Sequence, residues 1–135
     1  MYIMTEDEPR PDLASQKVLV VEDEVALRSL LADVLRDAHL TVLEAPNADA
    51  ALEILRTQRD IALVFTDVRM PGSMNGIELA GIVQSEFPKT KIIVTSGRRK
   101  SDEWKKGLQW VQKPYLYWTV MDAILTALHQ KWENI

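Results

Sequence analysis

The chain has 135 residues, of which 47% are hydrophobic and 27% charged, the balance of a single globular domain with room for a core. Its formal net charge of -4 gives no reason to expect a nucleic-acid partner. The absence of cysteine excludes disulfides and thiolate chemistry, and the only histidines, His39 and His129, are too far apart in the chain to suggest a zinc site.

The sequence carries no sign of membrane insertion or export. No apolar run approaches the ~18–20 residues that a membrane-spanning helix needs. The opening stretch MYIMTEDEPRPD is acidic and lacks the basic and then apolar order of a secretory signal. We therefore predict a cytoplasmic protein that contacts neither membrane nor nucleic acid, with a flexible tail over residues 1–14 and one domain over residues 15–135.

From Lys17 onward, short apolar runs alternate with apolar residues at helical spacing. The runs that predict strands are, in chain order, KVLVVE, LTVLE, IALVF, KIIVT and LQWVQ. The residues that mark the helices are Leu27 to Ala38, Ala48 to Leu55, Leu79 to Phe87 and Met121 to Leu128. Between the last two strands, RRKSDEWKKG predicts a short polar helix or a loop. Trp118 lies one turn before Met121, so we expect its side chain in the core.

Strands that alternate with helices predict an α/β fold with a parallel sheet covered on both faces. Five such units in a chain of this size predict a flavodoxin-like doubly wound (βα)5 domain with the strand order 2-1-3-4-5. In this order the first and third strands are neighbours, and ligands bind at the carboxyl ends of the strands. The residues that follow each strand are therefore the candidates for a functional site.

Charged and hydroxyl residues gather at these strand ends. They are Glu22, Asp23, Glu24, Asp67, Thr95, Ser96 and Lys113, and Pro114 follows the lysine. Carboxylates that meet in one place repel each other unless a cation lies between them, and oxygen ligands suit Mg²⁺. A carboxylate can also be a nucleophile toward phosphorus, with a metal, a lysine and a hydroxyl to hold the phosphoryl oxygens. Taken alone, Asp67 could instead be a turn or helix cap.

Four motifs in this order, VLVVEDE, FTDVRMPG, IIVTSG and VQKPY, resemble the receiver domain of two-component response regulators over about residues 16 to 131. The resemblance implies that Asp67 is the phospho-acceptor. It implies that Mg²⁺ is bound by Asp23, by Asp67 and by the backbone carbonyl of Arg69. Glu22 is expected to help through a water molecule.

The resemblance also assigns the groups that respond to phosphorylation. Lys113 is expected to pair with the phosphoryl group, with a cis bond to Pro114. The switch hydroxyl is expected to be Ser96, because it precedes the small residue Gly97, with Thr95 as the alternative. Trp110 occupies the position of the aromatic switch partner, where tyrosine or phenylalanine is usual in the family.

Two stretches of the chain differ in length from the usual family pattern. The loop MPGSMNG is one residue longer than the common form, and the stretch between Ser96 and Lys113 is shorter. The second difference affects the fourth helix of the family, which forms part of the usual output surface. We therefore expect that helix to be short or disordered.

The resemblance implies a single-domain response regulator that takes its phosphoryl group from a histidine kinase or phosphotransfer protein and signals to a downstream protein partner. It is not expected to be an enzyme beyond its own phosphorylation and dephosphorylation. One alternative is a Mg²⁺-dependent phosphatase with an aspartyl nucleophile, although Arg69 stands where such enzymes carry a second aspartate. Others are an interaction module that is not phosphorylated and a receiver cut from a longer protein.

Aromatic residues are concentrated in the last third of the chain and cannot all be buried in a domain this small. They are Trp104, Trp110, Tyr115, Tyr117, Trp118 and Trp132. Exposed aromatic clusters often mark protein interfaces. We therefore expect a partner or homodimer surface over the fifth strand, the last helix and the segment before them.

Overall fold

The computed structural model describes residues 16–97 and 108–133. The predicted tail, the boundary at residue 15 and the polar stretch RRKSDEWKKG lie outside these residues. The strands are β1 (Lys17–Val21), β2 (Thr41–Ala45), β3 (Ile61–Asp67), β4 (Lys91–Ser96) and β5 (Gln109–Gln112). The helices in the described ranges are α1 (Val25–Asp37), α2 (Ala48–Thr57), α3 (Gly76–Glu86) and α4 (Tyr117–Glu133).

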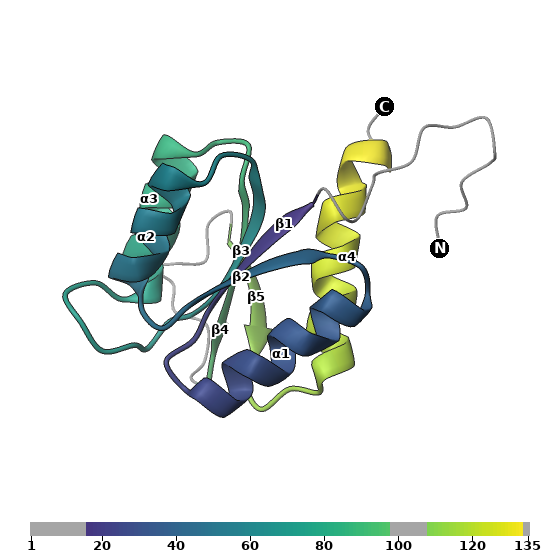
Figure 1. Cartoon of the computed structure of the whole chain (residues 1–135), viewed down its shortest axis with the longest axis horizontal. Coiled ribbons are helices and arrows are strands. Elements are labelled where there is room, and N and C mark those ends of the chain that lie inside the picture. Colours follow the sequence, from purple (N-terminus) through teal and green to yellow (C-terminus); the bar gives the residue numbers. More distant parts are fainter. Residues whose placement is uncertain (1–15, 98–107, 134–135) are drawn as a thin grey trace.

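The five strands form one parallel sheet in the order β2-β1-β3-β4-β5, as the sequence predicts. In Figure 1, α2 and α3 lie together on one side of the sheet, and α1 and α4 lie on the other. This is the flavodoxin-like doubly wound arrangement, in which successive crossovers cover both faces of a parallel sheet. In the part of the chain that the structure describes, no helix is both long and apolar enough to cross a bilayer.

The central strand β3 supplies both cores, because successive side chains of a strand point to opposite faces. Leu63 and Phe65 belong to the buried cluster with α1 and α4, and Val64 belongs to the cluster with α2 and α3. Each of these side chains is at most 2% exposed. Burial of one such side chain stabilises the fold by roughly 1.5–3 kcal/mol. The strand that ends at Asp67 is therefore firmly fixed in place.

The expectation that Trp118 lies in the core is wrong, since the residue is 52% exposed. Helix α4 instead buries Val120 and Ile124, both 0% exposed. Trp118 precedes Val120 by two positions, which places it roughly 200° around the helix from that buried residue. Its ring packs edge-on against Tyr117, with ring centroids 5.3 Å apart.

A capping box fixes the start of α3, just after the loop that follows Asp67. The Asn75 side chain accepts a hydrogen bond from the Glu78 N–H at 2.9 Å, and the Glu78 carboxylate accepts one from the Asn75 N–H at 3.0 Å. These bonds satisfy two backbone donors that a helix start leaves free. The next residue, Gly76, donates its N–H to the Val68 carbonyl at 2.9 Å, so α3 begins directly against the end of β3.

Candidate functional site

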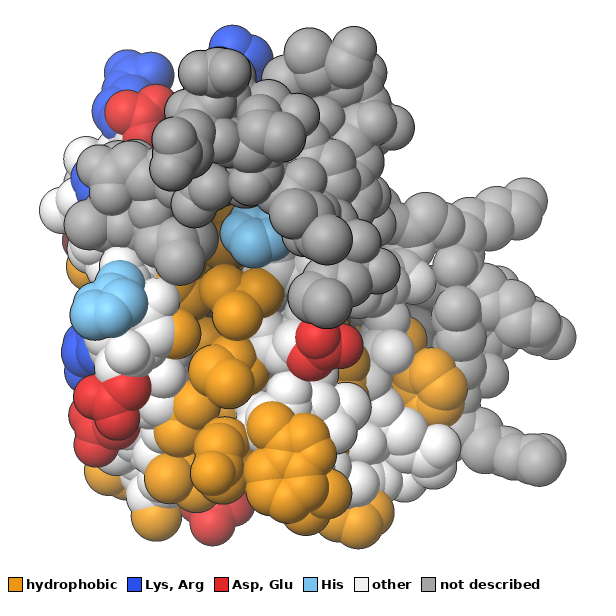
Figure 2. Space-filling model, turned by 90° about the vertical axis from the view of Figure 1, so that its right-hand side faces the viewer, with side chains coloured by type: hydrophobic (Ala, Val, Ile, Leu, Met, Phe, Trp, Pro, Cys, Tyr) orange, Lys and Arg blue, Asp and Glu red, His pale blue; other side chains and the backbone are white. Residues whose placement is uncertain are grey.

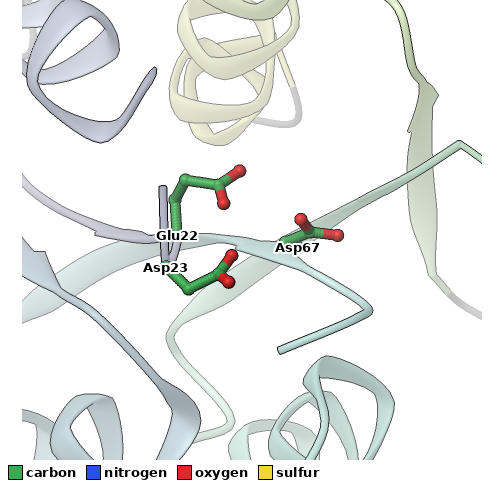
Figure 3. A group of neighbouring side chains, drawn as sticks. All are labelled: Glu22, Asp23 and Asp67. Atoms are coloured by element: carbon green, nitrogen blue, oxygen red, sulfur yellow. The ribbon is translucent and has the colours of Figure 1, made fainter. Parts of the chain in front are cut away.

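Three carboxylates meet at the carboxyl edge of the sheet, at the junction of β1 and β3. Glu22 and Asp23 follow β1, and Asp67 is the last residue of β3. Figure 3 shows the three side chains around one space, and their ligand oxygens all lie within 4.8 Å of one another. The adjacency of β1 and β3 in the sheet therefore brings together residues that are 44 positions apart in the sequence, as predicted.

The environment of the three acids differs. Glu22 and Asp67 are buried, at 3% and 7% exposed, whereas Asp23 is exposed. Burial is the main cause that raises the pKa of Glu22 above its usual range, because it disfavours the charged form. A group of carboxylates that is partly buried and open on one side fits Mg²⁺, which binds oxygen ligands and keeps several of its waters.

Lys113 supplies the positive charge of the site. Its Nζ lies 2.7 Å from Asp67 Oδ2 and 3.1 Å from Glu22 Oε1. Burial alone would lower the pKa of this lysine, but its hydrogen bonds to Asp67 and Glu22 raise it above the usual range. The Lys113–Pro114 peptide bond is cis, as the family resemblance implies. Lys113 therefore stays protonated at neutral pH and faces the carboxylate that is the predicted acceptor.

Backbone N–H groups bind the second carboxylate oxygen of Asp67 and of Glu22. The Arg69 N–H donates to Asp67 Oδ1 at 3.2 Å, and the Glu24 N–H donates to Glu22 Oε2 at 3.1 Å. Asp67 is thus bound on one oxygen by the backbone and on the other by Lys113. The predicted roles of the Arg69 carbonyl as a metal ligand and of Glu22 through a water molecule stay predictions.

Thr95 and Ser96 both lie at the buried end of β4, at 1% and 3% exposed. Thr95 is the register partner of Asp67, and its Oγ1 is buried with no hydrogen-bond partner among the described residues. The Ser96 carbonyl accepts a hydrogen bond from the Lys113 N–H at 2.8 Å, which ties it to the lysine of the site. Ser96 as the switch hydroxyl, with Thr95 as the alternative, stays a prediction.

The role of Trp110 as the aromatic switch partner also stays a prediction. Its side chain is half-buried and packs against the core cluster that includes α2 and α3.

The loop between β3 and α3 is anchored to the neighbouring helix α2. The Ser73 hydroxyl donates to Asp49 Oδ1 at 2.8 Å, and Asp49 lies in the first turn of α2. Gly72 has a φ of 113°, a conformation that favours glycine. This turn and this hydrogen bond accommodate the loop that the sequence predicts to be longer than usual.

Sequence reasoning missed Gly76 and Tyr115 as residues of the site. A pocket of about 410 Å³ opens beside Lys113, and Tyr115, Leu27 and Pro114 are among the residues that line it. The Tyr115 hydroxyl is buried without a hydrogen-bond partner in the described ranges, and burial raises its pKa to about 12. The sequence signal for Tyr115 was its place after Lys-Pro, and for Gly76 the Asn-Gly pair before a helical pattern.

The acidic cluster predicts that Mg²⁺ stabilises the fold. A ligand that binds only the folded state at about 100 times its Kd adds ~2.7 kcal/mol to the free energy of unfolding. We expect the wild type to melt at a higher temperature in Mg²⁺ than in EDTA, and the Asp23→Asn variant to lose most of that difference. Asp33→Asn, at an exposed position of α1, is the matched control and should respond as the wild type does. Equal wild-type melting temperatures in Mg²⁺ and EDTA would contradict the metal site.

Alkaline pH is expected to destabilise the protein from about pH 10 upward. An unfolded tyrosine loses its proton near pH ~10, whereas the pKa of Tyr115 in the fold is about 12. The folded state therefore binds more protons in this window, so the free energy of unfolding falls as the pH rises through it. Tyr115→Phe should flatten this fall in urea titrations, and Tyr117→Phe, at an exposed position, should leave it as in the wild type. Identical profiles for all three proteins would count against this assignment.

Comparison with known proteins agrees with the fold. The family model of the response regulator receiver domain matches residues 18–125. An uncharacterised 14.6 kDa protein of Leptolyngbya boryana is 40% identical over 94 residues, which are 67% of this chain and 70% of that protein. The response regulator protein FleR of Pseudomonas aeruginosa is 37% identical over 78 residues, which are 58% of this chain and 16% of that protein. Several of the curated relatives are thus much longer than the region they share with this chain.

Solved structures show the same likeness. The receiver domain of the hybrid histidine kinase CckA is 30% identical, with a TM-score of 0.71 over 83% of this chain and 98% of that one. The response regulator TrrA of Thermotoga maritima, solved in complex with Mg²⁺-BeF, is 26% identical, with a TM-score of 0.75 over 83% of this chain and 98% of that one.

Proposed function

Because the chain belongs to the response regulator receiver domain family, we propose that it accepts a phosphoryl group on Asp67 and signals through protein–protein contacts. Receiver domains of two-component systems are signalling domains that bind Mg²⁺ at an acidic site. The donor proposed here is a sensor histidine kinase or a phosphotransfer protein. The observation that carries the proposal is the Asp67 carboxylate, buried beside two further acids and held 2.7 Å from Lys113 Nζ.

The chemistry is an in-line displacement at phosphorus. A carboxylate oxygen of Asp67 forms the new O–P bond while the N–P bond to the donor imidazole breaks, and the imidazole leaves with the electron pair of that bond. Lys113 neutralises negative charge on the transferring phosphoryl group, and the Arg69 N–H keeps the Asp67 carboxylate oriented. Glu22, Asp23 and Asp67 would hold Mg²⁺, which supplies further positive charge to the phosphoryl oxygens when bound.

The phosphorylated state differs from the unphosphorylated one in the contacts available to Lys113 and Ser96. Without a phosphoryl group, Lys113 is shared between Asp67 and Glu22. A phosphoryl group adds acceptor oxygens that the Lys113 ammonium and the Ser96 hydroxyl can contact. Contacts made in only one state shift a two-state equilibrium, and the half-buried Trp110 is the proposed aromatic partner in that shift.

The surface near the start of α4 is the proposed contact for a downstream protein or for a second copy of the chain. Leu116, Tyr117 and Trp118 are between 46% and 54% exposed, and Figure 2 shows hydrophobic side chains gathered on one face of the molecule. Large aromatic side chains of this kind are enriched at protein interfaces. Sedimentation with and without acetyl phosphate shows whether this surface forms a homodimer or stays exposed in a monomer, as a contact for another protein would. Trp104 and Trp132 lie outside the side chains that the structure describes.

Incubation with acetyl phosphate and Mg²⁺ tests the proposed function. We expect the intact mass to rise by one phosphoryl group in the wild type and in Asp60→Asn, and to stay unchanged in Asp67→Asn. Asp60 is the matched control because it is exposed and flanks the opposite end of β3, at a φ of 67° that asparagine tolerates. Repeated turnover of a generic phosphomonoester would instead favour the phosphatase alternative. Absence of any mass gain in the wild type would leave a module that is not phosphorylated.

A further inference from the structure

We propose that Arg28 is a positioning residue for the metal site, which it serves by clamping the turn that carries Glu22, Asp23 and Glu24. Arg28 lies in the first turns of α1, and its side chain is only 16% exposed. Among the described residues, its polar partners are the Glu22 carbonyl and the Glu44 carboxylate, so its action on the acidic cluster passes through the backbone. The proposal rests on the proposed function for the identity of the metal.

The clamp fixes the backbone of Glu22 from both sides. Arg28 Nη1 donates to the Glu22 carbonyl at 2.8 Å, and the Glu22 N–H donates to the Ala45 carbonyl of β2 at 3.1 Å. Both polar groups of this residue's backbone are therefore satisfied by partners outside the turn. The start of α1 has no side-chain cap at Glu24, so the capping that orients many helix starts is absent here. The bond from Arg28 compensates for that missing restraint.

A second contact of the Arg28 side chain is an ion pair without hydrogen-bond geometry. Its Nε lies 3.4 Å from Glu44 Oε1, on the neighbouring strand β2. The other oxygen of Glu44 is bound by Arg36 Nη2 at 3.2 Å. Glu44 is thus paired with two arginines of α1. Of these two, Arg28 is the one that also contacts Glu22. Arg28 and Arg36 therefore share a role in attaching α1 to β2 and differ in the contact with Glu22.

The direction of the carboxylates depends on this turn. Glu22 and Asp23 supply two of the three acids whose oxygens lie within 4.8 Å of one another. A change in the backbone dihedral angles of this turn would alter where both carboxylates point relative to Asp67, because the turn carries both side chains. Residues that orient metal ligands through hydrogen bonds typically change metal affinity by roughly 10–100-fold when they are replaced. We expect an effect in this range for the loss of Arg28.

The matched pair Arg28→Met and Arg36→Met tests the clamp. Mg²⁺ titration should give a Kd about tenfold higher for Arg28→Met than for the wild type, and a Kd within about twofold of the wild type for Arg36→Met. In EDTA, the Glu24 amide, which donates to Glu22 Oε2, should exchange its hydrogen faster in Arg28→Met than in Arg36→Met. Arg28→Leu, which also removes the donor to the Glu22 carbonyl, gives the same comparison if Arg28→Met does not fold.

Equal Mg²⁺ affinities for the two variants, with equal exchange at Glu24, would overturn the clamp and leave Arg28 as a residue that only attaches α1 to β2. Failure of the wild type to bind Mg²⁺ would overturn the proposed function instead. In that case the exchange rate of the Glu24 amide in EDTA still decides whether Arg28 orders the turn. The two failures are therefore distinguishable.

Discussion

Replacement of Gly76 by alanine is expected to lower the free energy of unfolding by roughly 3 kcal/mol and to impair phosphorylation of Asp67. A Cβ on Gly76 would overlap the Asp67 carbonyl oxygen and would lie 2.8 Å from the Asp67 carbonyl carbon and 2.9 Å from Val68 Cα. All three are backbone atoms, so no side-chain rotation relieves the overlap. Either α3 or the end of β3 must move, and the second movement displaces Asp67, the proposed phospho-acceptor.

Gly81→Ala is the matched control, since Gly81 lies in the same helix and a Cβ there would meet no heavy atom within 4 Å. Alanine in a helix interior is more favourable than glycine by roughly 0.5–1 kcal/mol, so this variant should be as stable as the wild type or slightly more stable. Urea unfolding in EDTA measures both variants without a contribution from metal. Equal stability of Gly76→Ala and the wild type would show that the close approach at Gly76 is absent in solution.

Replacement of Lys113 by alanine is expected to slow phosphorylation of Asp67 by roughly 10²-fold. Its ammonium is the cation that lies against Asp67, and it is available to neutralise charge on the phosphoryl group. The same change should tighten Mg²⁺ binding about tenfold, which is ~1.4 kcal/mol. The reason is that Lys113 occupies Asp67 Oδ2 and Glu22 Oε1, two oxygens of the acidic cluster, and competes with a metal for them.

The opposite signs of these two effects separate a specific role of Lys113 from general damage to the site. A variant with a distorted site would lose metal affinity and phosphorylation together. Lys89→Ala, at an exposed position on the opposite edge of the sheet, should change neither quantity. Rates of mass gain with acetyl phosphate, together with Mg²⁺ titration, provide the measurement. Weaker Mg²⁺ binding in Lys113→Ala would contradict the competition between the lysine and the metal.

The fold and the acids Glu22, Asp23 and Asp67 could be predicted because the strand pattern is local in the sequence and determines the order of the strands in the sheet. Continuous apolar runs mark buried parallel strands, and the doubly wound order then brings the ends of β1 and β3 together. Glu22, Asp23 and Asp67 follow from that order without any knowledge of side-chain geometry. The order of the four motifs then identifies the family, which the match over residues 18–125 confirms.

Features that depend on three-dimensional packing could not be predicted in the same way. The exposure of Trp118 depends on which helical stripe faces the sheet, and the apolar residues of α4 are compatible with more than one stripe. The close approach of Gly76 to Asp67 depends on the path of the loop between them. The contact of Arg28 with the Glu22 carbonyl joins a helix to a preceding turn, and an arginine on a helix surface carries no sign of it in the sequence.

The central claim is that Asp67 is the residue that receives the phosphoryl group. The most direct measurement is to phosphorylate the wild type with acetyl phosphate and Mg²⁺, reduce the acyl phosphate with borohydride, and locate the reduced residue by peptide mass spectrometry. We predict reduction at Asp67 alone, dependent on both acetyl phosphate and Mg²⁺. Reduction at a different residue, or no reduced residue in a folded protein, would contradict the claim.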